Sequence, residues 1–483
     1  MKKETANAFD AIFKPKSIAV IGASDTFGKW GYRMVDRPLK TDYPGVIYPI
    51  NSKKTNILGL KAYPSVTAVP ADIDLAIIAT PTATVPGILA ECIQKGIKGA
   101  VVISAGFAEA GEDGKNLEQE MVKVARTGPI RLVGPNCMGI WSAAGHLNLC
   151  FPTAPKKGPI TFLSQSGTFG VAMAQVANDK GYGLGKFISI GNQADLEVCD
   201  YLEYLADDDD TKVIAIYLEG LKDGRRFFEV AKQVVRKKPI VVYKSGRSPA
   251  GERATMSHTA SIAGAAEIFD GMCRQIGLLQ AKETFHLFEM AEALVRLPLP
   301  SGKRVAILGS GGQGVVGTDA CSALGLELPP LDKETAASIN ALLPAHAPPA
   351  TNPIDFAGAH RTAMQEAKII EKLFKLDYID GVISNVPISP QLFDRNLKID
   401  RHADNQPQRV KTALEGAQLY ASLPAKYNKP IICLRFARIG NDIMEEVLGE
   451  GGIPTYSTPE QCARAMHALV SYGRVRRKTE ATD

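Results

Sequence analysis

The chain has 483 residues, 45% of them hydrophobic and 22% charged, which is typical of a globular protein with roughly three domains. Its 56 basic and 51 acidic residues leave a net charge of +5, too small to indicate a nucleic-acid-binding protein. The first ten residues lack the apolar segment of a signal peptide, and no run approaches the roughly eighteen apolar residues that span a bilayer, so we expect a cytoplasmic protein without a membrane partner.

Short apolar runs alternate with helical patterns from one end of the chain to the other. We expect strands at 17–22, 45–50, 74–80, 99–104, 160–164, 186–191, 212–218, 239–244, 304–309, 380–385 and 430–435. Between the third and fourth runs, apolar residues recur at helical spacing from Val85 to Ile93, and Gly96 closes the pattern. Apolar strands joined by helices are typical of parallel sheets, so we predict an α/β fold of three serial doubly wound domains.

Segments rich in proline, glycine and lysine mark the domain boundaries, at 151–159 and 297–303. A further proline-rich segment, 344–353, is expected to be a long loop inside the third domain. The eight cysteines form no CxxC pair, so we expect reduced thiols instead of a zinc site or disulfides. The predicted organisation is a first domain at 1–150, a second at 158–296, a third at 302–473 and a basic tail at 474–483.

A glycine-rich turn follows the first expected strand. Gly22 ends this strand, and Ala23, Ser24 and Gly28 follow it. Glycines at this place let the backbone approach a phosphate, which the amides of the next helix then bind. The spacing is not GxGxxG, and the second strand ends near Lys53 instead of the acidic residue that NAD requires. Basic residues suit the additional phosphate of NADP or coenzyme A, with a structural turn that binds no ligand as the alternative.

Three further loops, rich in small and hydroxyl residues, follow later strands of the first domain. Ligands of open parallel sheets bind beyond the carboxyl ends of the strands, so we expect these loops to line one crevice together with Gly22. The candidate cofactor-binding residues in these loops are Thr80, Pro81, Ser104, Ala105, Gly106 and Asn136.

The second domain opens with a strand, a Ser-Gly turn and a helix. Ser166, Gly167 and Thr168 begin this helix, where backbone amides and the helix dipole suit a phosphoryl group. The same residues are also good helix caps, which is the alternative interpretation. Glu219 ends a later strand, so its carboxylate is expected in the same crevice, either paired with an imidazole or simply solvated.

A single histidine lies between two hydroxyl residues in the segment SHTASIAG, residues 257–264. None of the seven histidines is spaced from another as metal ligands are, which argues against a metal site. A core histidine normally lies in an apolar pattern, whereas this one lies among small polar residues. His258 is therefore a candidate catalytic residue, with a structural role as the alternative.

Nine segments, in order between residues 21 and 264, carry a resemblance to a known family, and ILGSGGQGVVGTDAC (307–321) and NPIDFAG (352–358) extend it over nearly the whole chain. They are IGAS (21–24), YPIN (48–51), GAVVISAGFAEAG (99–111), GPNCMGI (134–140), FLSQSG (162–167), ISIGNQADLE (188–197), YLEGLKDGRRF (217–227), KSGR (244–247) and SHTASIAG. The series resembles the ADP-forming acyl-CoA synthetases, and more narrowly their separate α subunit, which is related to the α subunit of succinyl-CoA synthetase. The resemblance implies a Rossmann-like CoA-binding domain followed by two flavodoxin-like domains.

The resemblance also implies roles for individual residues. In that family the first domain binds CoA and the second carries a phosphorylatable histidine, which corresponds to His258. Glu219 matches the carboxylate that holds the histidine, residues 166–168 match a phosphate-binding helix start, and the glycine loop within 307–321 matches one that borders the subunit interface. One departure is Ala260, where the family has glycine, and because alanine does not freely adopt positive φ, loop geometry and turnover are open to change.

The sequence shows neither a GxxxxGK[ST] motif nor a recognisable ATP-grasp segment. In the family that module belongs to a β subunit or to a fused C-terminal region, so the resemblance implies that ATP or ADP and Mg²⁺ bind on an ATP-grasp partner in a hetero- or homo-oligomer. The implied reaction interconverts acyl-CoA, ADP and phosphate with a carboxylic acid, CoA and ATP through an acyl phosphate and a phosphohistidine.

Two other classes of function are weighed against this enzyme. A CoA- or acyl-CoA-binding regulatory protein would keep the fold without turnover, but the intact His258 and Glu219 favour the enzyme. An NADP-dependent oxidoreductase is disfavoured because GxGxxG is missing. The sequence does not identify the carboxylic acid, since one methylene changes binding by only ~1–3 kcal/mol.

Overall fold

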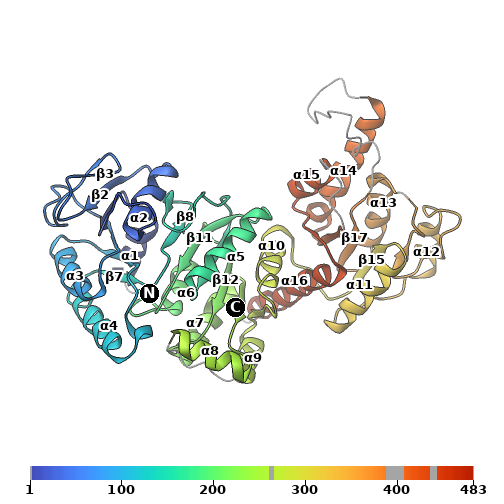
Figure 1. Ribbon diagram of the computed structural model, residues 1–483. Helices are drawn as coiled ribbons and strands as arrows, with labels where there is room; N and C mark the ends of the chain where they lie inside the picture. The colour runs from blue at the N-terminus through green and yellow to red at the C-terminus, as the bar shows by residue number, and fades with distance from the viewer. Residues whose placement is uncertain (1–2, 260–265, 360, 388–406, 436–442, 482–483) are drawn as a thin grey trace. The chain divides into compact units, whose positions relative to one another are not determined.

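The computed structural model of the chain describes residues 3–259, 266–359, 361–387, 407–435 and 443–481. They form two compact units, Met1–Phe288 and Glu289–Asp483. The first unit contains a five-stranded and a seven-stranded sheet, and the second contains another five-stranded sheet (Figure 1). This confirms the α/β fold with parallel sheets that the sequence predicts.

The first sheet has five parallel strands in the order β2-β1-β5-β6-β7. The strands are β1 (Ser17–Ile21), β2 (Val46–Ile50), β5 (Leu75–Ile78), β6 (Gly99–Val102) and β7 (Arg131–Val133), with a separate hairpin of β3 (Asn56–Ile57) and β4 (Leu60–Lys61). The helical segments are α1 (Lys3–Phe13), α2 (Trp30–Lys40), η1 (Thr82–Thr84), α3 (Val85–Gln94), η2 (Ala108–Ala110) and α4 (Glu112–Ala125). Strand order reverses at β1, so the carboxyl ends of β1 and β5 flank the crevice in which such sheets bind ligands.

The second sheet has the order β14-β13-β12-β10-β11-β8-β9. Its strands are β8 (Ile140–Ser142), β9 (Leu147–Asn148), β10 (Ile160–Ser164), β11 (Leu184–Ser189), β12 (Val213–Leu218), β13 (Ile240–Lys244) and β14 (Leu279–Gln280). Its helices are α5 (Gly167–Asp179), α6 (Val198–Ala206), α7 (Gly224–Lys237), α8 (Pro249–Thr259) and α9 (Ala266–Ile276). β8 runs antiparallel to β11, so residues 140–148, which precede the proline-rich segment 151–159, belong to this sheet. The order again reverses at the first parallel strand, between β10 and β12.

The third sheet is parallel, in the order β16-β15-β17-β18-β19. Its strands are β15 (Val305–Gly309), β16 (Ile354–Asp355), β17 (Gly381–Asn385), β18 (Ile431–Leu434) and β19 (Thr455–Tyr456). The helices of this part are α10 (His286–Arg296), α11 (Gly312–Ala323), α12 (Lys333–Asn340), α13 (Ala363–Phe374), α14 (Gln408–Tyr427), α15 (Ile443–Glu450) and α16 (Pro459–Glu480). Residues 344–353 contain no helix or strand, which confirms the predicted loop.

All eleven predicted strands are present. Each places a run of apolar side chains between layers of helices, which is the environment that an apolar run indicates. Every residue of β1, β5, β6, β10, β11 and β12 is buried. The helix predicted from Val85 is α3, and Gly96 behind it has a φ of +81°. All eight cysteines are buried and free, as the sequence indicates. Burial on both faces is therefore the signal that made these strands recognisable.

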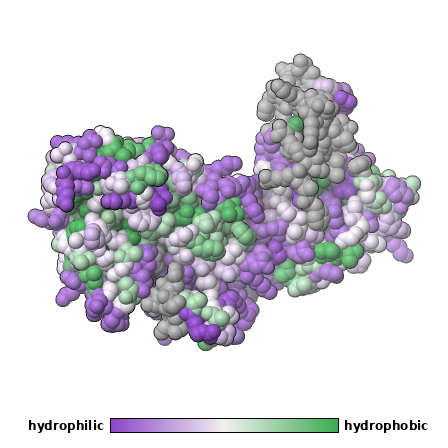
Figure 2. Space-filling view, in the orientation of Figure 1, coloured by the Kyte–Doolittle hydropathy of each residue, from purple (hydrophilic) through white to green (hydrophobic). Residues whose placement is uncertain are grey.

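The visible face of the first unit is mostly hydrophilic, with apolar residues scattered over it (Figure 2). Among the residues that the structure describes, no helix is both long enough and apolar enough to cross a bilayer.

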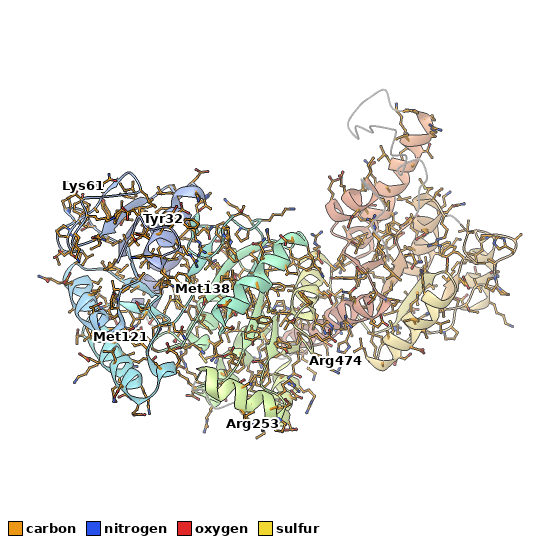
Figure 3. All side chains as sticks on the ribbon, viewed as in Figure 1. Tyr32, Lys61, Met121, Met138, Arg253 and Arg474 are labelled. Atoms are coloured by element: carbon orange, nitrogen blue, oxygen red, sulfur yellow. The ribbon has the colours of Figure 1, made fainter. Side chains whose placement is uncertain are left out.

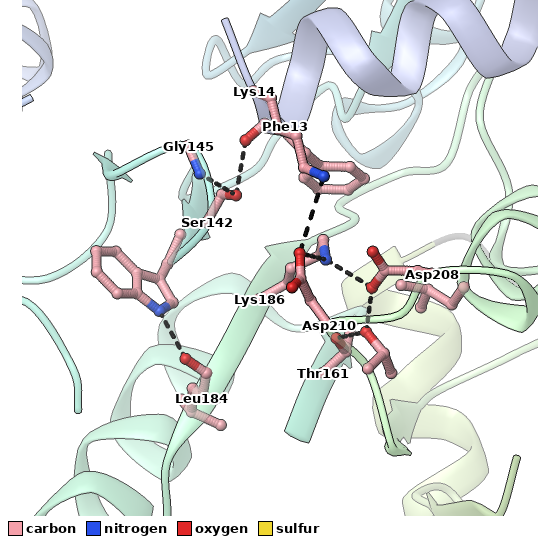
Figure 4. Close-up of polar contacts among 12 residues, drawn as sticks. Phe13, Lys14, Ser142, Gly145, Thr161, Leu184, Lys186, Asp208 and Asp210 are labelled. Carbon is pink, nitrogen blue, oxygen red and sulfur yellow. Dashed lines mark hydrogen bonds and ion pairs between the residues drawn. The ribbon is translucent and has the colours of Figure 1, made fainter. Parts of the chain in front are cut away.

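The N-terminal helix joins the two sheets of the first unit. In α1, Ile12 packs against Gly99 of β6, where an added Cβ would lie 2.8 Å from the Ile12 side chain. At the end of α1 the carbonyl of Phe13 accepts a hydrogen bond from Ser142 Oγ at 2.7 Å, and its ring lies 5.8 Å from the ammonium of Lys186 (Figure 4). This fully buried ammonium pairs with Asp208 at 2.6 Å, so a charged cluster lies beneath α1.

Candidate active site

Two loops at the carboxyl edge of the first sheet approach each other closely. Gly22, directly after β1, has a φ of +86°, and a Cβ at this position would lie 2.4 Å from the carbonyl oxygen of Ala79. Gly31, in the first turn of α2, would place a Cβ 1.9 Å from the carbonyl oxygen of Gly22. Gly28 also has positive φ, +88°, but lies in open space. The bend of the loop therefore requires glycine at position 22 for steric reasons.

The loops after β1 and β2 are tied together by Asn51. Its Nδ2 donates to the carbonyl of Ala23 at 2.9 Å, and its Oδ1 accepts the amide of Lys53 at 2.9 Å. Lys54 binds the carboxylate of Asp25 at 2.5 Å and lowers the pKa of that carboxyl. The exposed Lys53 side chain makes no hydrogen bond or ion pair within the described residues, so its charge remains available to an anionic ligand.

Side-chain hydroxyls fasten the loops after β5 and β6 to each other. Ser104 Oγ donates to the carbonyl of Thr80 at 2.6 Å and accepts the Thr80 amide at 3.2 Å. Thr82 Oγ1 donates to the carbonyl of Ala105 at 2.6 Å, beside Pro81 at the start of η1. The hydroxyls of Ser104 and Thr82 are thus engaged with backbone, and they shape the crevice instead of facing it as free donors.

A polar network connects the carboxyl edges of the first and second sheets. Glu109 Oε1 accepts the amides of Gly106 at 2.6 Å and Phe107 at 3.3 Å, while its Oε2 accepts Asn192 Nδ2 at 2.6 Å. The same amide donates to Glu118 at 2.8 Å, and its oxygen accepts Asn136 Nδ2 at 3.3 Å. Burial raises the pKa of Glu109, but these hydrogen bonds outweigh it, and the net pKa is lowered.

The loop after β7 brings the two carboxyl edges into direct contact. The amide of Met138 donates to Ser189 Oγ, at the end of β11, at 2.9 Å. A Cβ at Gly167 would lie 2.6 Å from Met138 Cγ, so the loop presses against the start of α5. Figure 3 labels Met138 at this junction. Ligands in the two crevices would therefore be neighbours.

The start of α5, at the buried Ser166, is the candidate phosphate site. Ser166 is the N-cap residue of α5, yet its side chain makes no capping hydrogen bond. Its carbonyl accepts a hydrogen bond from Ser164 Oγ at 2.7 Å, which fixes the turn from below. Thr168 is exposed. Because the amides of the first turn have no side-chain cap, an anion can bind there, which favours the phosphate interpretation over simple capping.

Glu219 lies beside this turn, directly after β12, and only 5% of the residue is exposed. Gln165 Oε1 accepts the backbone amides of Glu219 at 2.8 Å and Gly220 at 3.0 Å. Burial raises the pKa of the Tyr217 phenol, and the Glu219 carboxylate nearby raises it further. A glutamate buried at this edge retains a defined position, as a residue that orients a base requires.

His258 lies in the last turn of α8, and the side chains of residues 256–265, its own included, lie outside what the structure describes. Its pairing with Glu219 therefore stays a prediction. The described part of α8 contacts η2 of the first sheet. It also packs on the loop after β13, where a Cβ at Gly246 would lie 2.6 Å from Thr255 Oγ1. The backbone that carries the histidine thus begins close to both crevices.

The third sheet has its own glycine loop, after β15. The amide of Gly311 donates to Asp355 Oδ1 at 3.0 Å, which joins the segments 307–321 and 352–358. Beyond it, Val315 and Val316 of α11 are 60% and 43% exposed. The role at a subunit interface that the resemblance gives to this loop stays a prediction.

Four polar residues of the site were not singled out from the sequence: Gln165, Asn192, Glu109 and Lys244. Each lies within a segment that carries the family resemblance, which is the one signal that points to them. Their contacts with other elements join residues more than twenty positions apart, as in the hydrogen bonds of Gln165 and Lys244 with the backbone of Glu219, and such contacts leave no local pattern.

Comparisons with known proteins agree with this geometry. Residues 16–143 match the model of a CoA binding domain, and residues 157–294 match a succinyl-CoA ligase like flavodoxin domain. The α subunit of ADP-forming acetate–CoA ligase II of Pyrococcus furiosus is 40% identical, covering 95% of this chain and 97% of that subunit. ADP-forming acetate–CoA ligase I of Archaeoglobus fulgidus is 37% identical over 97% of this chain, which spans only 64% of that longer relative.

A solved structure is similar over the whole length of the chain. Acetyl-coenzyme A synthetase 1 of Ca. Korarchaeum cryptofilum, described as dinucleotide-forming and in complex with phosphate and ADP, has a TM-score of 0.84 and 32% identity over 99% of both chains. These matches confirm the predicted family and fold. The chain therefore belongs to the family of ADP-forming acetate–CoA ligases, which are acid–thiol ligases, and corresponds over nearly its whole length to their α subunit.

Proposed function

We propose that this chain binds CoA and a small carboxylic acid, such as the acetate of its relatives, and passes a phosphoryl group to ADP through His258. The observation that carries this proposal is the contact of Met138 with Gly167, which makes the CoA crevice and the open start of α5 neighbours. A thioester in one crevice would then lie within reach of a phosphate in the other.

CoA suits the first crevice because it carries a pyrophosphate and a further ribose phosphate. The exposed ammonium of Lys53 can meet one of these charges, and the glycine turn permits close approach of the backbone. We assign CoA to Gly22, Ala23, Ser24, Gly28, Lys53, Thr80, Pro81, Ser104, Ala105, Gly106 and Asn136.

The reaction then proceeds in three balanced steps. A phosphate oxygen attacks the thioester carbon and the C–S bond breaks, which gives an acyl phosphate and CoA. A ring nitrogen of His258 attacks phosphorus and the P–O bond to the acyl group breaks, which releases the carboxylate. A β-phosphate oxygen of ADP attacks phosphorus and the P–N bond breaks, which yields ATP and free histidine. All three steps are reversible.

Two groups of the second domain support these steps. The amides that begin α5, at Ser166, Gly167 and Thr168, stabilise the negative charge on the phosphoryl oxygens. The Glu219 carboxylate orients the imidazole and stabilises its positive charge while phosphorus is bound. Both groups lie at the carboxyl edge of the second sheet.

The nucleotide and its Mg²⁺ are proposed to bind on an ATP-grasp β subunit. Two relatives that match almost end to end are named α subunits, and the Archaeoglobus relative contains additional sequence beyond the length that this chain covers. A partner chain would supply what that additional sequence supplies, so an oligomer of α and β subunits is expected. The Mg²⁺ accompanies the nucleotide phosphates there.

Mass spectrometry at neutral or alkaline pH tests the proposal. The chain is incubated with a candidate β subunit, ATP and Mg²⁺, and a mass increase of about 80 Da, one phosphoryl group, is expected. This adduct should be absent from His258→Ala. Tight CoA binding without an adduct, whatever the partner, would overturn the enzyme and favour a regulatory CoA-binding protein.

A further inference from the structure

The second sheet contains two buried lysines, one on β11 and one on β13. Lys186 on β11 pairs in register with Thr161, near the start of β10, and is fully buried. Lys244 is the last residue of β13, pairs in register with Leu218 at the end of β12, and is 5% exposed. A buried ammonium is costly unless its donors are satisfied, so the partners of each lysine indicate what the charge is there to hold.

The partners of the two lysines differ in kind. Lys186 pairs with the carboxylate of Asp208 at 2.6 Å, far from the carboxyl edge. Lys244 Nζ donates to two backbone carbonyls, that of Glu219 at 2.7 Å and that of Ser245 at 2.6 Å. Burial lowers the pKa of Lys244, Arg247 lowers it further, and the Glu219 charge opposes both. Lys244 thus fixes backbone at the site where the reaction is proposed.

The peptide groups of Glu219 are held from both neighbouring strands. Its amide donates to Gln165 Oε1, just beyond β10, at 2.8 Å. Its carbonyl accepts from Lys244, at the end of β13. With β12 lying between β10 and β13, these two bonds fix the backbone of Glu219 directly after its strand ends. The direction of the carboxylate then depends on few remaining torsions.

The second carbonyl that Lys244 binds begins the segment that carries the histidine. Ser245 is followed by Gly246, with a φ of +68°, on which Thr255 of α8 packs. His258 comes three residues after Thr255, less than one helical turn further along α8. One ammonium therefore links the strand end that carries Glu219 to the start of the loop and helix that carry His258.

We propose that Lys244 is a positioning residue, whose ammonium sets the Glu219 carbonyl and the Ser245 carbonyl relative to each other so that the carboxylate meets the histidine. This inference rests on the proposed function, because it assumes that His258 is phosphorylated. Lys244 acts through Glu219 and does not touch the substrate. A displacement of about 1 Å at such a site costs on the order of a hundredfold in rate.

The test compares Lys244→Met with the matched control Lys186→Met, since both remove a buried ammonium from the same sheet. For each variant, with the β subunit present, we measure the rate of His258 phosphorylation by mass spectrometry, CoA affinity by calorimetry and the melting temperature. Both variants are expected to melt at lower temperature. Only Lys244→Met should slow phosphorylation, by about tenfold or more, with CoA affinity unchanged.

Equal slowing in the two variants at equal stability would show a general effect of destabilisation and overturn the inference. Lys244→Arg is measured if the methionine variant does not fold. The arginine retains the charge but changes the position of the donor nitrogen, so phosphorylation at the wild-type rate in this variant would also overturn the inference. If the wild-type chain is not phosphorylated at His258, the proposed function itself fails, and this outcome is distinguishable from the other two.

Discussion

The side-chain amide of Asn192 donates to the carboxylate of Glu109 at 2.6 Å, and so joins the loop after β11 of the second sheet to the loop after β6 of the first. The other oxygen of Glu109 holds the amides of Gly106 and Phe107. The conformation of the Gly106 loop, which we propose binds CoA, therefore depends on a residue of the second domain. This is a physical route by which one crevice supports the other.

Asn192→Ala is expected to weaken CoA binding, because it frees Glu109 from its partner and loosens the Gly106 loop. One lost hydrogen bond to a charged group is worth ~1.5–3 kcal/mol, which corresponds to roughly a tenfold or greater rise in Kd measured by calorimetry. Gln175→Ala is the control, since Gln175 also donates to a carboxylate, Asp179 at 2.9 Å, but on the exposed surface of α5. Equal CoA affinities in both variants would contradict the role of Asn192.

Glu109 also makes stability depend on pH. Because the pKa of Glu109 in the folded chain lies below the ordinary 4.5, its ionised form stabilises the fold above that pH, and the stabilisation is lost as the pH falls through the lower, folded value. Glu109→Gln removes the titration, so the difference in melting temperature between wild type and variant should be largest near pH 7 and shrink on acidification. A difference in melting temperature that grows below pH 4.5 would mean that folding raises the pKa of Glu109, contrary to this prediction. Glu118, which shares Asn192, is left intact.

The close approach of the two loops at Gly22 is tested by comparing alanine substitutions at Gly22 and Gly28. Both glycines have positive φ, but only Gly22 has neighbouring atoms where a Cβ would lie. Gly28→Ala should cost about 1–2 kcal/mol in the free energy of unfolding, from backbone strain alone. Gly22→Ala adds a Cβ at 2.4 Å from the Ala79 carbonyl, so its cost should exceed that by about 1–3 kcal/mol, measured by denaturant titration. A smaller cost for Gly22→Ala than for Gly28→Ala would mean that the two loops do not approach so closely.

The sequence predicted the parts of the site that depend on position along a single strand. Apolar runs located β10 and β12, and the residues after them, Ser166 and Glu219, could be assigned to one crevice because parallel strands share a carboxyl edge. Gly22 was recognisable for the same reason. The sequence did not predict the shortest strands, because two or three residues are too few to show a period; these are β3, β4, β7, β8, β9, β14, β16 and β19.

The sequence did not predict the contacts between elements. A lysine that ends an apolar strand normally extends into solvent. The residues next to Lys244 in the sequence therefore do not indicate that its ammonium is buried and donates to two backbone carbonyls. Asn192 and Glu109 are 83 residues apart, and polar residues in loops are common. The pairing of Asn192 with Glu109 depends on how the two sheets pack, and that of Lys244 on how neighbouring strands align; local patterns encode neither.

Substitution of Ser166 distinguishes a phosphate-binding role of this residue from a helix-capping role. Its side chain makes no capping hydrogen bond, so Ser166→Ala should change the free energy of unfolding by less than about 0.5 kcal/mol while slowing His258 phosphorylation. Thr362→Ala is the control, because Thr362 Oγ1 does cap α13 through the amide of Gln365 at 3.2 Å. That variant should lose ~1 kcal/mol, as measured by denaturant titration, with phosphorylation unchanged. The reverse pattern would identify Ser166 as a cap.

We predict that Phe169 limits the size of the acid. It directly follows the exposed Thr168 in the first turn of α5, and it is itself 40% exposed. The planes of the Phe169 and Tyr217 rings make an angle of 62°, and the ring centroids are 5.1 Å apart. The acyl group of an acyl phosphate is one oxygen away from the phosphoryl group, so an acid whose phosphoryl group lies at the helix start must extend close to this ring.

Phe169→Ala should therefore raise kcat/KM for bulky aryl acids relative to acetate by about tenfold or more, the effect of opening a pocket by more than one methylene. Phe285→Ala is the control, since Phe285 is a similarly exposed aromatic residue, at 48%, which lies before α10 and carries Lys180 over its ring instead of facing the α5 start. The ratio of the two kcat/KM values is measured for each variant in the assembled enzyme. If this ratio changes equally in both variants, or in neither, the acyl group does not bind beside Phe169. Removing a side chain that contacts the acid must change which acids fit, and this change must be specific to that side chain.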